Sequence, residues 1–277
     1  MSATRSPRAE LRPFVKSLWA SAGAPSPATR ELVLPSGTMH VVVRLDPAPL
    51  RVFDEIDSVQ SRTFGTSVIG GPRSRYYVKD VSTPSASVGA ELHPGAAEAL
   101  FGVPAGALAE THTPLDEVVG AVAGELRDRL FASRTAEARV AVLEAFLLSR
   151  LPRRTPLHPA VADALAWFRQ SSDVREAVRR SGYSHRRFSD VFRSAVGLSP
   201  KLYCRVTRWY GVLGATQRDH ASWADLAFEA GYSDQPHLHR DFRDFAGMSP
   251  GRYRALCPDG SRHVSLDGTS IPSKTRG

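Results

Sequence analysis

Residues 182–203 read GYSHRRFSDVFRSAVGLSPKLY, and residues 231–253 read GYSDQPHLHRDFRDFAGMSPGRY. Both stretches open on Gly-Tyr-Ser, continue through a segment with regularly spaced Phe or Leu, and close on Gly-x-Ser-Pro with a Tyr three residues later. The second copy is one residue longer between its two glycines. Two copies are too few for a solenoid, which needs three or more repeats. The chain therefore uses one small motif twice.

Each copy predicts two short helices joined by a tight turn. In the first copy Gly182 ends one helix, since glycine readily adopts positive φ, and Ser184 is a candidate N-cap for the next. Spacings of three and four place two sets of residues on helix faces: Val174, Ala177, Val178 and Ser181, then Phe188, Val191, Phe192 and Ala195. In the second copy Ser233 or Asp234 is the N-cap, and the sets are Leu226, Ala227 and Ala230, then Leu238, Phe242 and Phe245. This arrangement is a helix-turn-helix, whose second helix can enter the DNA major groove.

The exposed face of each second helix carries side chains that can contact DNA. Arg bonds guanine, Gln bonds adenine, and Ser bonds either. A single charged helix face is more often an ordinary solvated surface, but two such faces on two matching motifs favour DNA binding. The candidate DNA-binding residues are Ser184, His185, Arg186, Arg187, Ser189 and Arg193 in the first motif, and Gln235, His237, His239, Arg240 and Arg243 in the second.

The region from Pro159 to Leu256 resembles the AraC/XylS family of transcriptional regulators. The residues that carry the resemblance are Leu226-Ala227, Ala230-Gly231-Tyr232-Ser233-Asp234-Gln235, His237-Leu238, Arg240, Phe242-Arg243, Gly247-Met248-Ser249-Pro250 and Tyr253. The resemblance implies two helix-turn-helix subdomains joined by a long helix, with double-stranded promoter or operator DNA as the partner. RNA polymerase, an unidentified small-molecule effector and a second copy of the chain are further candidate partners.

The two motifs depart from the family pattern at different places. In relatives, the position that matches Arg240 commonly approaches the groove, whereas the matching position of the first motif holds Asp190. A carboxylate there repels phosphate, although it could accept from a cytosine amino group. The first motif is therefore expected to contribute less sequence specificity than the second. Pro236 is also unusual, but a proline is tolerated in the first turn of a helix.

The first half of the chain predicts short strands followed by helices. Candidate strands, separated by turns with Gly or Pro, cover residues 32–34, 39–45, 51–53, 67–69, 75–78 and 87–92. Candidate helices follow at 95–101, 114–131 and 137–151. The expected fold class is therefore α+β: a small β-sandwich or barrel plus helices, followed by an all-α double helix-turn-helix domain.

This half also resembles a cupin-like regulatory domain that is often found before AraC-type DNA-binding regions. The similar pieces are Leu34-Pro35-Ser36-Gly37, Gly70-Gly71-Pro72, His93-Pro94-Gly95-Ala96-Ala97 and Val103-Pro104-Ala105. The resemblance names no ligand, so the ligand-binding residues are unknown at this stage.

A regulatory domain of this kind needs a ligand pocket, a dimer surface or both. Strand 39–45 is expected to wall an apolar pocket for a small, uncharged or weakly polar molecule, with Trp19, Tyr76 or Tyr77 as stacking groups. In the alternative, these aromatic residues are plain core and the domain only dimerises. Helices 114–131 and 137–151 are the expected dimer surfaces.

Proline and polar residues set the expected boundaries. Three prolines and two arginines between 151 and 159 indicate an extended linker. A tail rich in Ser, Gly, Asp, Lys and Arg indicates disorder. The expected segments are a regulatory domain at 1–151, a linker at 152–159, a DNA-binding domain at 160–256 with its joining helix at 199–217, and a disordered tail at 257–277.

Composition narrows the class of protein further. The net charge is +8, and residues 157–256 hold 15 Lys and Arg against 10 Asp and Glu, which gives this region +5. Cys204 and Cys257 make neither a disulfide framework nor a zinc site and suggest a reducing compartment. No apolar run has the length of a membrane helix or signal peptide, so we expect a cytoplasmic protein.

The sequence gives no support for catalysis. It contains no nucleophile elbow or phosphate-binding glycine loop, and the first half has no pair of histidines at metal-ligand spacing. We therefore expect no enzymatic activity, no cofactor and no metal. The leading hypothesis is a sequence-specific transcriptional regulator that is controlled through its N-terminal domain. The alternative is a non-specific DNA-binding or protein-interaction protein without ligand control.

Overall fold

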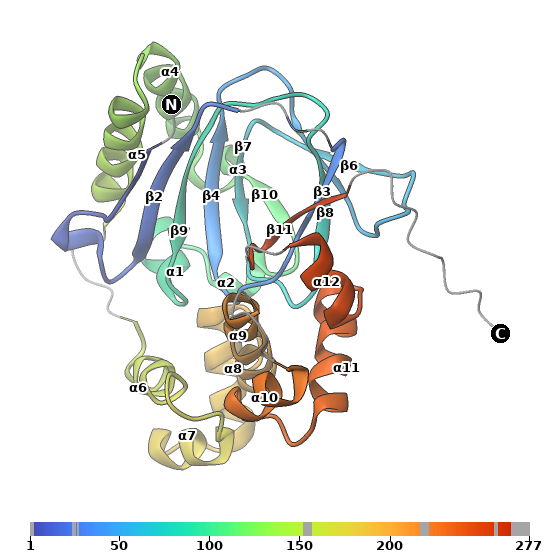
Figure 1. Ribbon diagram of the computed structural model, residues 1–277. Helices are drawn as coiled ribbons and strands as arrows, with labels where there is room; N and C mark the ends of the chain where they lie inside the picture. The colour runs from blue at the N-terminus through green and yellow to red at the C-terminus, as the bar shows by residue number, and fades with distance from the viewer. Residues whose placement is uncertain are drawn as a thin grey trace.

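The computed structural model describes residues 3–23, 26, 28–151, 157–216, 222–257 and 260–266. Two antiparallel sheets with flanking helices form the first half, and helices form most of the second (Figure 1). This arrangement confirms the predicted α+β class, with a sheet-rich N-terminal region followed by a helical helix-turn-helix region.

The larger sheet has the strand order β1-β2-β9-β4-β7-β10, and the smaller has the order β11-β3-β8-β5-β6. Side chains alternate between the faces of β4: Met39, Val41 and Val43 are buried, whereas His40 and Val42 on the other face are half-buried. The strands are β1 Ala3–Arg5, β2 Val15–Ser21, β3 Arg30–Val33, β4 Met39–Arg44, β5 Leu50–Phe53, β6 Arg62–Phe64, β7 Ser67–Gly70, β8 Tyr77–Asp80, β9 Ser87–Leu92, β10 His112–Pro114 and β11 His263–Leu266.

Helices pack against one face of the larger sheet. Helix α5 contacts β2 and β9, and its residues Leu143 and Leu147 join Val41 and Leu92 in a common hydrophobic core. The helices of this half are a 3₁₀ helix at Ala9–Leu11, α1 Ala96–Phe101, α2 Ala105–Leu108, α3 Leu115–Val119, α4 Val122–Ala132 and α5 Ala136–Arg150.

The single helix predicted at 114–131 is wrong. Residues up to Pro114 belong to β10, and the helical segment is divided into α3 and α4 at Gly120. Gly120 has φ of 67° and ψ of −149°. Glycine readily adopts this backbone conformation, but it lies outside the α-helical region and so interrupts the helix. The apolar spacing continued through the break, which is why the sequence pattern suggested one helix.

The second half contains α6 Pro159–Trp167, α7 Val174–Ser181, α8 His185–Val196, α9 Pro200–Ala215, α10 Trp223–Glu229, α11 Gln235–Ala246 and α12 Pro250–Leu256. Local chemistry sets these boundaries as the sequence predicts. Gly182 has φ of 70° and ends α7, and Ser184 Oγ accepts from the Arg187 amide at 3.3 Å at the start of α8. Ser199 caps α9, the predicted joining helix, with Pro200 at its first position. Residues 152–156 of the predicted linker lie outside the described residues.

The two motifs are stabilised by different cores. The first motif, α7 and α8, packs with α6 in a cluster centred on Val161, Phe188 and Phe192. The second motif, α10 and α11, shares a cluster with α9, α12 and the smaller sheet, where Phe245 and Trp209 meet Leu32 and Val78. The Tyr76 amide donates to the Phe245 carbonyl at 3.0 Å, so the sheet region is also hydrogen-bonded to the end of α11.

The prediction of a disordered tail is wrong for His263–Leu266. These residues form β11, which pairs antiparallel with β3 at the edge of the smaller sheet. Val264 is fully buried in the core that the second motif shares with this sheet. The four residues gain their order from β3, which lies more than 200 residues earlier in the chain, and a local pattern carries no sign of such a partner. Residues 267–277 of the predicted tail lie outside the described residues.

Candidate functional site

Helix α8, the second helix of the first motif, presents its N-terminal half to solvent. His185, Arg186, Arg187 and Asp190 are exposed, and Ser189 is half-buried. Arg193 is also exposed, but it lies where α8 approaches the N-terminal region: its carbonyl oxygen would lie 3.0 Å from a Cβ added to Gly106 of α2. The structure therefore brings together the predicted residues of this motif, and it leaves Ser184 occupied as a helix cap.

Helix α11, the second helix of the second motif, presents Arg240 and Arg243 to solvent. The Asp234 carboxylate caps the helix by accepting from the His237 amide at 2.6 Å, which settles the choice between Ser233 and Asp234. Beside the two arginines, a shallow depression is lined by Gln235, Pro236, His239, Arg240 and Arg243.

The three remaining predicted side chains of α11 are half-buried and have partners. His237 Nδ1 lies 3.2 Å from Ser233 Oγ, and its ring contacts that of Tyr232. Gln235 Nε2 lies 3.2 Å from His239 Nε2. These contacts hold the three side chains close to the helix, whereas Arg240 and Arg243 are free to extend from it.

Ion pairing separates the arginines of this region into two groups. Arg179 pairs with Glu176, and Arg180 pairs with Asp163, both on the helices that precede the turn of the first motif. Arg205 of α9 pairs with two carboxylates of α11. Within the described parts of the chain, no ion pair is found for the arginines that the sequence predicts to contact DNA: Arg186, Arg187, Arg193, Arg240 and Arg243. Their charges remain available for an external anion.

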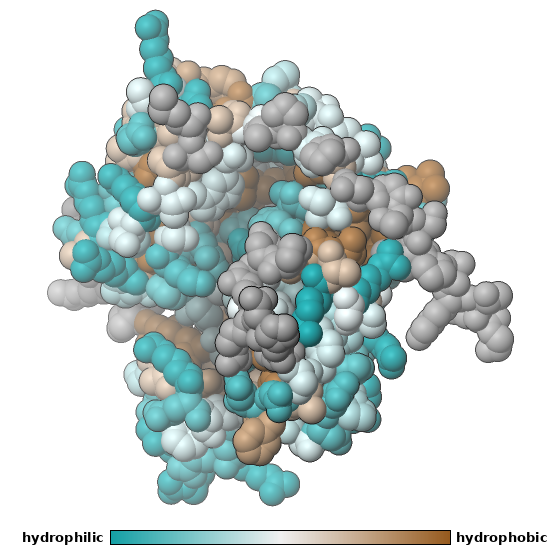
Figure 2. All heavy atoms as spheres, in the orientation of Figure 1, coloured by the Kyte–Doolittle hydropathy of each residue, from teal (hydrophilic) through white to brown (hydrophobic). Residues whose placement is uncertain are grey.

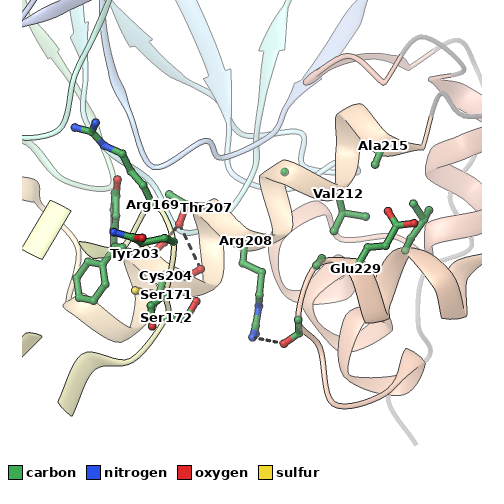
Figure 3. A pocket seen from close by; sticks show the side chains of 16 residues that line it. Arg169, Ser171, Ser172, Tyr203, Cys204, Thr207, Arg208, Val212, Ala215 and Glu229 are labelled. Carbon is green, nitrogen blue, oxygen red and sulfur yellow. Dashed lines mark hydrogen bonds between the residues drawn. The ribbon is translucent and has the colours of Figure 1, made fainter. Parts of the chain in front are cut away.

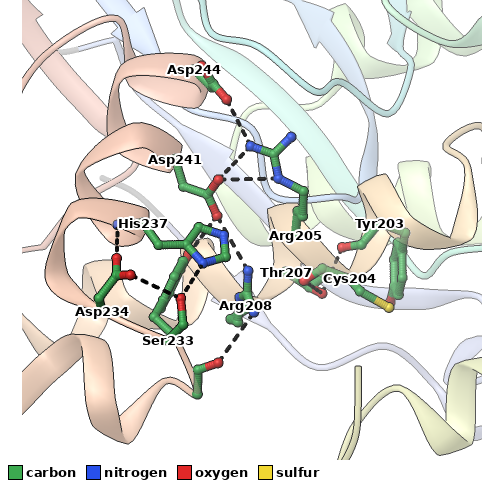
Figure 4. A network of polar contacts seen from close by, with 12 residues as sticks. Tyr203, Cys204, Arg205, Thr207, Arg208, Ser233, Asp234, His237, Asp241 and Asp244 are labelled. Carbon is green, nitrogen blue, oxygen red and sulfur yellow. Dashed lines mark hydrogen bonds and ion pairs between the residues drawn. The ribbon is translucent and has the colours of Figure 1, made fainter. Parts of the chain in front are cut away.

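A buried carboxylate fixes α11 against the joining helix α9 (Figure 4). Asp241 has no exposed surface and accepts from Arg205 Nη2 at 2.5 Å and from the Tyr232 hydroxyl at 2.9 Å. Burial, followed by the charge of Asp241, raises the pKa of Tyr232. Burial lowers the pKa of Arg205, but the hydrogen bonds that it donates to Asp241 and Asp244, with the charges of these carboxylates, outweigh burial and leave that pKa raised. The sequence reasoning missed Asp241, although its spacing from Leu238 and Phe245 places it on the apolar stripe of α11.

A cleft of about 820 Å³ separates the two motifs along α9 (Figure 3). Tyr203, Cys204 and Arg208 of α9 line it, together with Arg169, which lies between α6 and α7, and Glu229 of α10. Burial raises the pKa of the Cys204 thiol to about 12, so this group is a neutral thiol near pH 7 and a poor nucleophile.

A second cavity, of about 580 Å³, lies between the two sheets of the N-terminal region. The space-filling view shows a hollow among the strands, with hydrophobic residues inside it (Figure 2). The cavity lining includes the apolar residues Trp19, Val33, Val42, Leu50 and Val68. Its polar and charged residues include Glu31, His40, Arg44, Tyr77, Lys79, Asp80, His112, Arg262 and His263, with several serines. Trp19 and Tyr77 thus line a cavity, as the sequence analysis expected for a pocket.

Tyr76 does not line this cavity. Its side chain belongs to the core shared with the second motif, and its hydroxyl donates to Glu55 at 2.5 Å. A side chain at position 247 would overlap the Tyr76 ring, and Gly247 also has φ of 67° at the end of α11. Glycine is therefore required there both by the close approach and by the backbone conformation.

Two histidines give the cavity a polar side that the sequence analysis did not predict. Burial, followed by the charge of Arg73, lowers the pKa of His112 to about 3, so its ring is neutral near pH 7. Arg73 Nη2 donates to His112 Nδ1 at 3.1 Å, which assigns the ring proton to Nε2, a buried atom with no partner in the described structure. Burial also lowers the pKa of His40 well below its usual value. No sequence spacing joins these residues, because β4 and β10 lie on opposite sides of β7 in the sheet.

Comparison with family models supports the assignment of the second half. Residues 169–256 match the model of a helix-turn-helix domain, and residues 3–114 match that of a domain of unknown function (DUF6597). The first match covers both motifs and the joining helix. The C-terminal part of the chain therefore contains an AraC-type helix-turn-helix domain, a domain of DNA-binding transcription regulators.

Comparison with solved structures matched the chain to ToxT of Vibrio cholerae. An apo variant of ToxT is 8% identical with a TM-score of 0.47, over 86% of this chain and 97% of that chain. Wild-type ToxT bound to an unsaturated fatty acid is 9% identical with a TM-score of 0.45, over 85% of this chain and 94% of that chain. At this level of similarity neither structure indicates a ligand for this protein. A search of curated protein sequences found no match.

Two further properties concern the residues that the structure describes. None of their helices combines the length and apolar character that a membrane span requires. They also contain no cluster of three or more His, Cys, Asp or Glu side chains arranged to hold a metal ion.

Proposed function

We propose that the protein is a sequence-specific regulator whose helices α8 and α11 enter the major groove of promoter or operator DNA. The observation that carries this proposal is the set of exposed arginines without ion pairs on both helices, beside other arginines that are paired. Arginine forms bidentate bonds with guanine and binds phosphate, and free cations release condensed counterions when they contact DNA. A merely solvated helix face would not account for exposed arginines without described ion pairs on the second helix of both motifs.

The two motifs have different roles in this proposal. Arg240 faces away from the core and reads base edges, and Arg243, one turn further on, holds phosphate. In the first motif Asp190 repels phosphate near the groove, so Arg186 and Arg187 act mainly on the backbone. Sequence preference is therefore concentrated under α11.

The joining helix sets the reach of the two motifs. Helix α9 has 16 residues, which at 1.5 Å per residue span about 24 Å. Successive major grooves on one face of DNA lie about 34 Å apart. The shorter connector favours DNA that bends toward the protein, or full insertion of only one motif at a time.

The cavity between the sheets is the proposed effector site. Its apolar residues and its polar side suit a small molecule with an apolar body and one polar end. Neutral His112, together with the lining cations Lys79 and Arg262, suits a hydrogen-bond acceptor better than a cation. Dimerisation is the second proposed role of this region, and Phe131, a half-exposed residue of α4, lies on one of the helices expected to form the dimer surface. RNA polymerase remains a candidate partner without a proposed contact.

Selection of binding sites from random duplex DNA with the full chain tests the proposal. We expect a defined sequence motif, bound at least about 1,000-fold more tightly than scrambled DNA at physiological salt. Affinity should also fall steeply as salt increases. A salt-dependent affinity that is equal for all sequences would instead support the non-specific alternative. No binding at low salt would contradict a DNA-binding role.

A further inference from the structure

Strand β11 follows the second motif in sequence but forms part of the N-terminal cavity in space. Arg262 and His263 line the cavity beside Glu31 and Lys79 of the smaller sheet. A cavity enclosed only by the N-terminal half would have no lining residue in the C-terminal part of the chain. Here two of the lining residues belong to the C-terminal part of the chain.

The strand is firmly joined to the sheet. It pairs with β3 over four residues, and the Leu34 amide donates to the Arg262 carbonyl at 2.9 Å just before this pairing begins. His263 Nδ1 lies 2.5 Å from Glu31, which also pairs with Lys79 at 2.8 Å. Arg262 Nη1 donates to Ser36 Oγ at 3.3 Å.

The same strand is joined to the DNA-binding half. The Tyr253 hydroxyl of α12 donates to the Ser261 carbonyl at 2.9 Å, and the Cys257 thiol lies 3.6 Å from the His263 carbonyl. Tyr253 is fully buried, and its ring lies 5.7 Å from that of Phe242 in α11. A continuous set of contacts therefore runs from the cavity through β11 and α12 to the helix that carries Arg240.

We propose that β11 is a coupling strand, through which an occupant of the cavity changes the placement of α12 and α11 and so the affinity for DNA. An occupant with a hydrogen-bond acceptor contacts Arg262 or His263 directly and favours one position of the strand. A ligand shifts such an equilibrium only by its differential affinity for the two states. The inference rests on the proposed function in one respect, which is that the cavity receives a small molecule.

A second route of communication exists and must be separated from the first. The Tyr76–Phe245 hydrogen bond and the shared core connect the sheet to α11 without β11. If coupling follows this direct contact, β11 serves only to cover the sheet edge. The experiment must therefore disturb the cavity with and without the side chains of Arg262 and His263.

The ligand is unidentified, so the first measurement fills part of the cavity with a larger side chain of the protein itself. Val42 is half-buried and lines the cavity, so Val42→Phe places a larger side chain in it. Amide hydrogen exchange of the full chain without DNA should change about 5-fold or more at residues 263–266 and 250–256. The matched control is Val122→Phe on exposed α4, which should change neither segment. Changes confined to β4 and its neighbours β7 and β9 would overturn the proposal.

A double-mutant cycle then measures the coupling itself. The affinity for a selected DNA site is compared with and without Val42→Phe, in the full chain and in a chain that carries Arg262→Ala and His263→Ala. We expect Val42→Phe to change the Kd about 5-fold or more in the full chain and less than about 2-fold in the double variant. This double variant keeps the backbone of β11, which guards against loss of the fold.

An equal effect in both chains would assign coupling to the direct contact and refute the role of β11. Failure of the wild-type chain to bind DNA would refute the proposed function, while the exchange measurement would still show whether a change in the cavity reaches β11 and α12.

Discussion

The two helix-turn-helix motifs have nearly the same sequence pattern but are held in the molecule differently. The first packs against α6 in a core of its own, and it meets the N-terminal region mainly where α8 lies against α2. The second packs into a core that includes strands β3 and β8, and Val264 of β11 is buried in the same core. One motif is therefore placed by neighbouring helices, and the other by a sheet from the opposite end of the chain.

This difference bears on regulation. If the smaller sheet and α11 move as one body, a change in the N-terminal cavity displaces the second motif relative to the first. Such a displacement alters the spacing between the two recognition helices without unfolding either of them. The motif with the stronger proposed base contacts is thus also the one tied more closely to the proposed effector site.

The largest expected effect compares the two cores directly. Phe245→Ala and Phe192→Ala each remove a buried aromatic ring and should cost about 3–5 kcal/mol of stability. The loss from Phe245→Ala should extend to the smaller sheet and raise amide exchange in β3. Phe192→Ala should raise exchange in α6 to α8 only. Equal exchange in β3 for the two variants would contradict the separation of the cores.

The next effect concerns the anchor of α11. Asp241→Ala removes the buried acceptor of Arg205 and Tyr232 and should lower the free energy of unfolding by about 2 kcal/mol. Asp244→Ala is the matched control, because it breaks a contact of the same arginine but its carboxylate is 57% exposed. The control should cost less than about 1 kcal/mol. Urea denaturation of both variants measures the difference. Equal losses in the free energy of unfolding would contradict the proposal that Asp241 anchors α11.

The contrast between the DNA-facing surfaces is a third test. Arg240→Ala should cost about 1–3 kcal/mol on a selected site and broaden its sequence preference. Arg186→Ala with Arg187→Ala should weaken all sequences alike and reduce the salt dependence. Arg179→Ala serves as a control, because this arginine is already paired with Glu176. A sharper base preference under the first motif than under the second, in binding-site selection, would reverse the proposed ranking.

The smallest expected effect tests whether destabilising a recognition helix affects only its own motif or also the smaller sheet. Ser184→Ala and Asp234→Ala both remove the N-cap of a recognition helix and should each cost about 1 kcal/mol. In the first motif, exchange should rise within α8 alone, since its core is separate. In the second motif, amide exchange should also rise in β3 and β8. A purely local response at both caps would weaken the contrast between the motifs.

Structural features that depend on residues close together in the chain could be predicted from the sequence. Ser184, Ser199 and Gly182 each define a helix boundary by chemistry within a few residues, and the sequence predicted all three. Turns with Gly or Pro likewise marked out the strand predicted at 39–45, which is β4. Contacts between distant segments were not predictable in this way. Strand β11 depends on β3, and the polar side of the cavity depends on how the two sheets pack. Asp241 is intermediate, because its place on the apolar stripe of α11 was visible in the sequence but its partner on α9 was not.

The position of β11 has a consequence for the order in which the protein can be built. A ribosome releases the chain from its N-terminus, and domains generally fold as units as they emerge. Strand β3 emerges early, yet its edge stays unpaired until β11 has left the ribosome, after the whole helix-turn-helix region. The smaller sheet is thus completed last, when the DNA-binding helices already exist. Release of a chain that stops short of residue 263 would leave an open sheet edge, a feature that promotes association between chains.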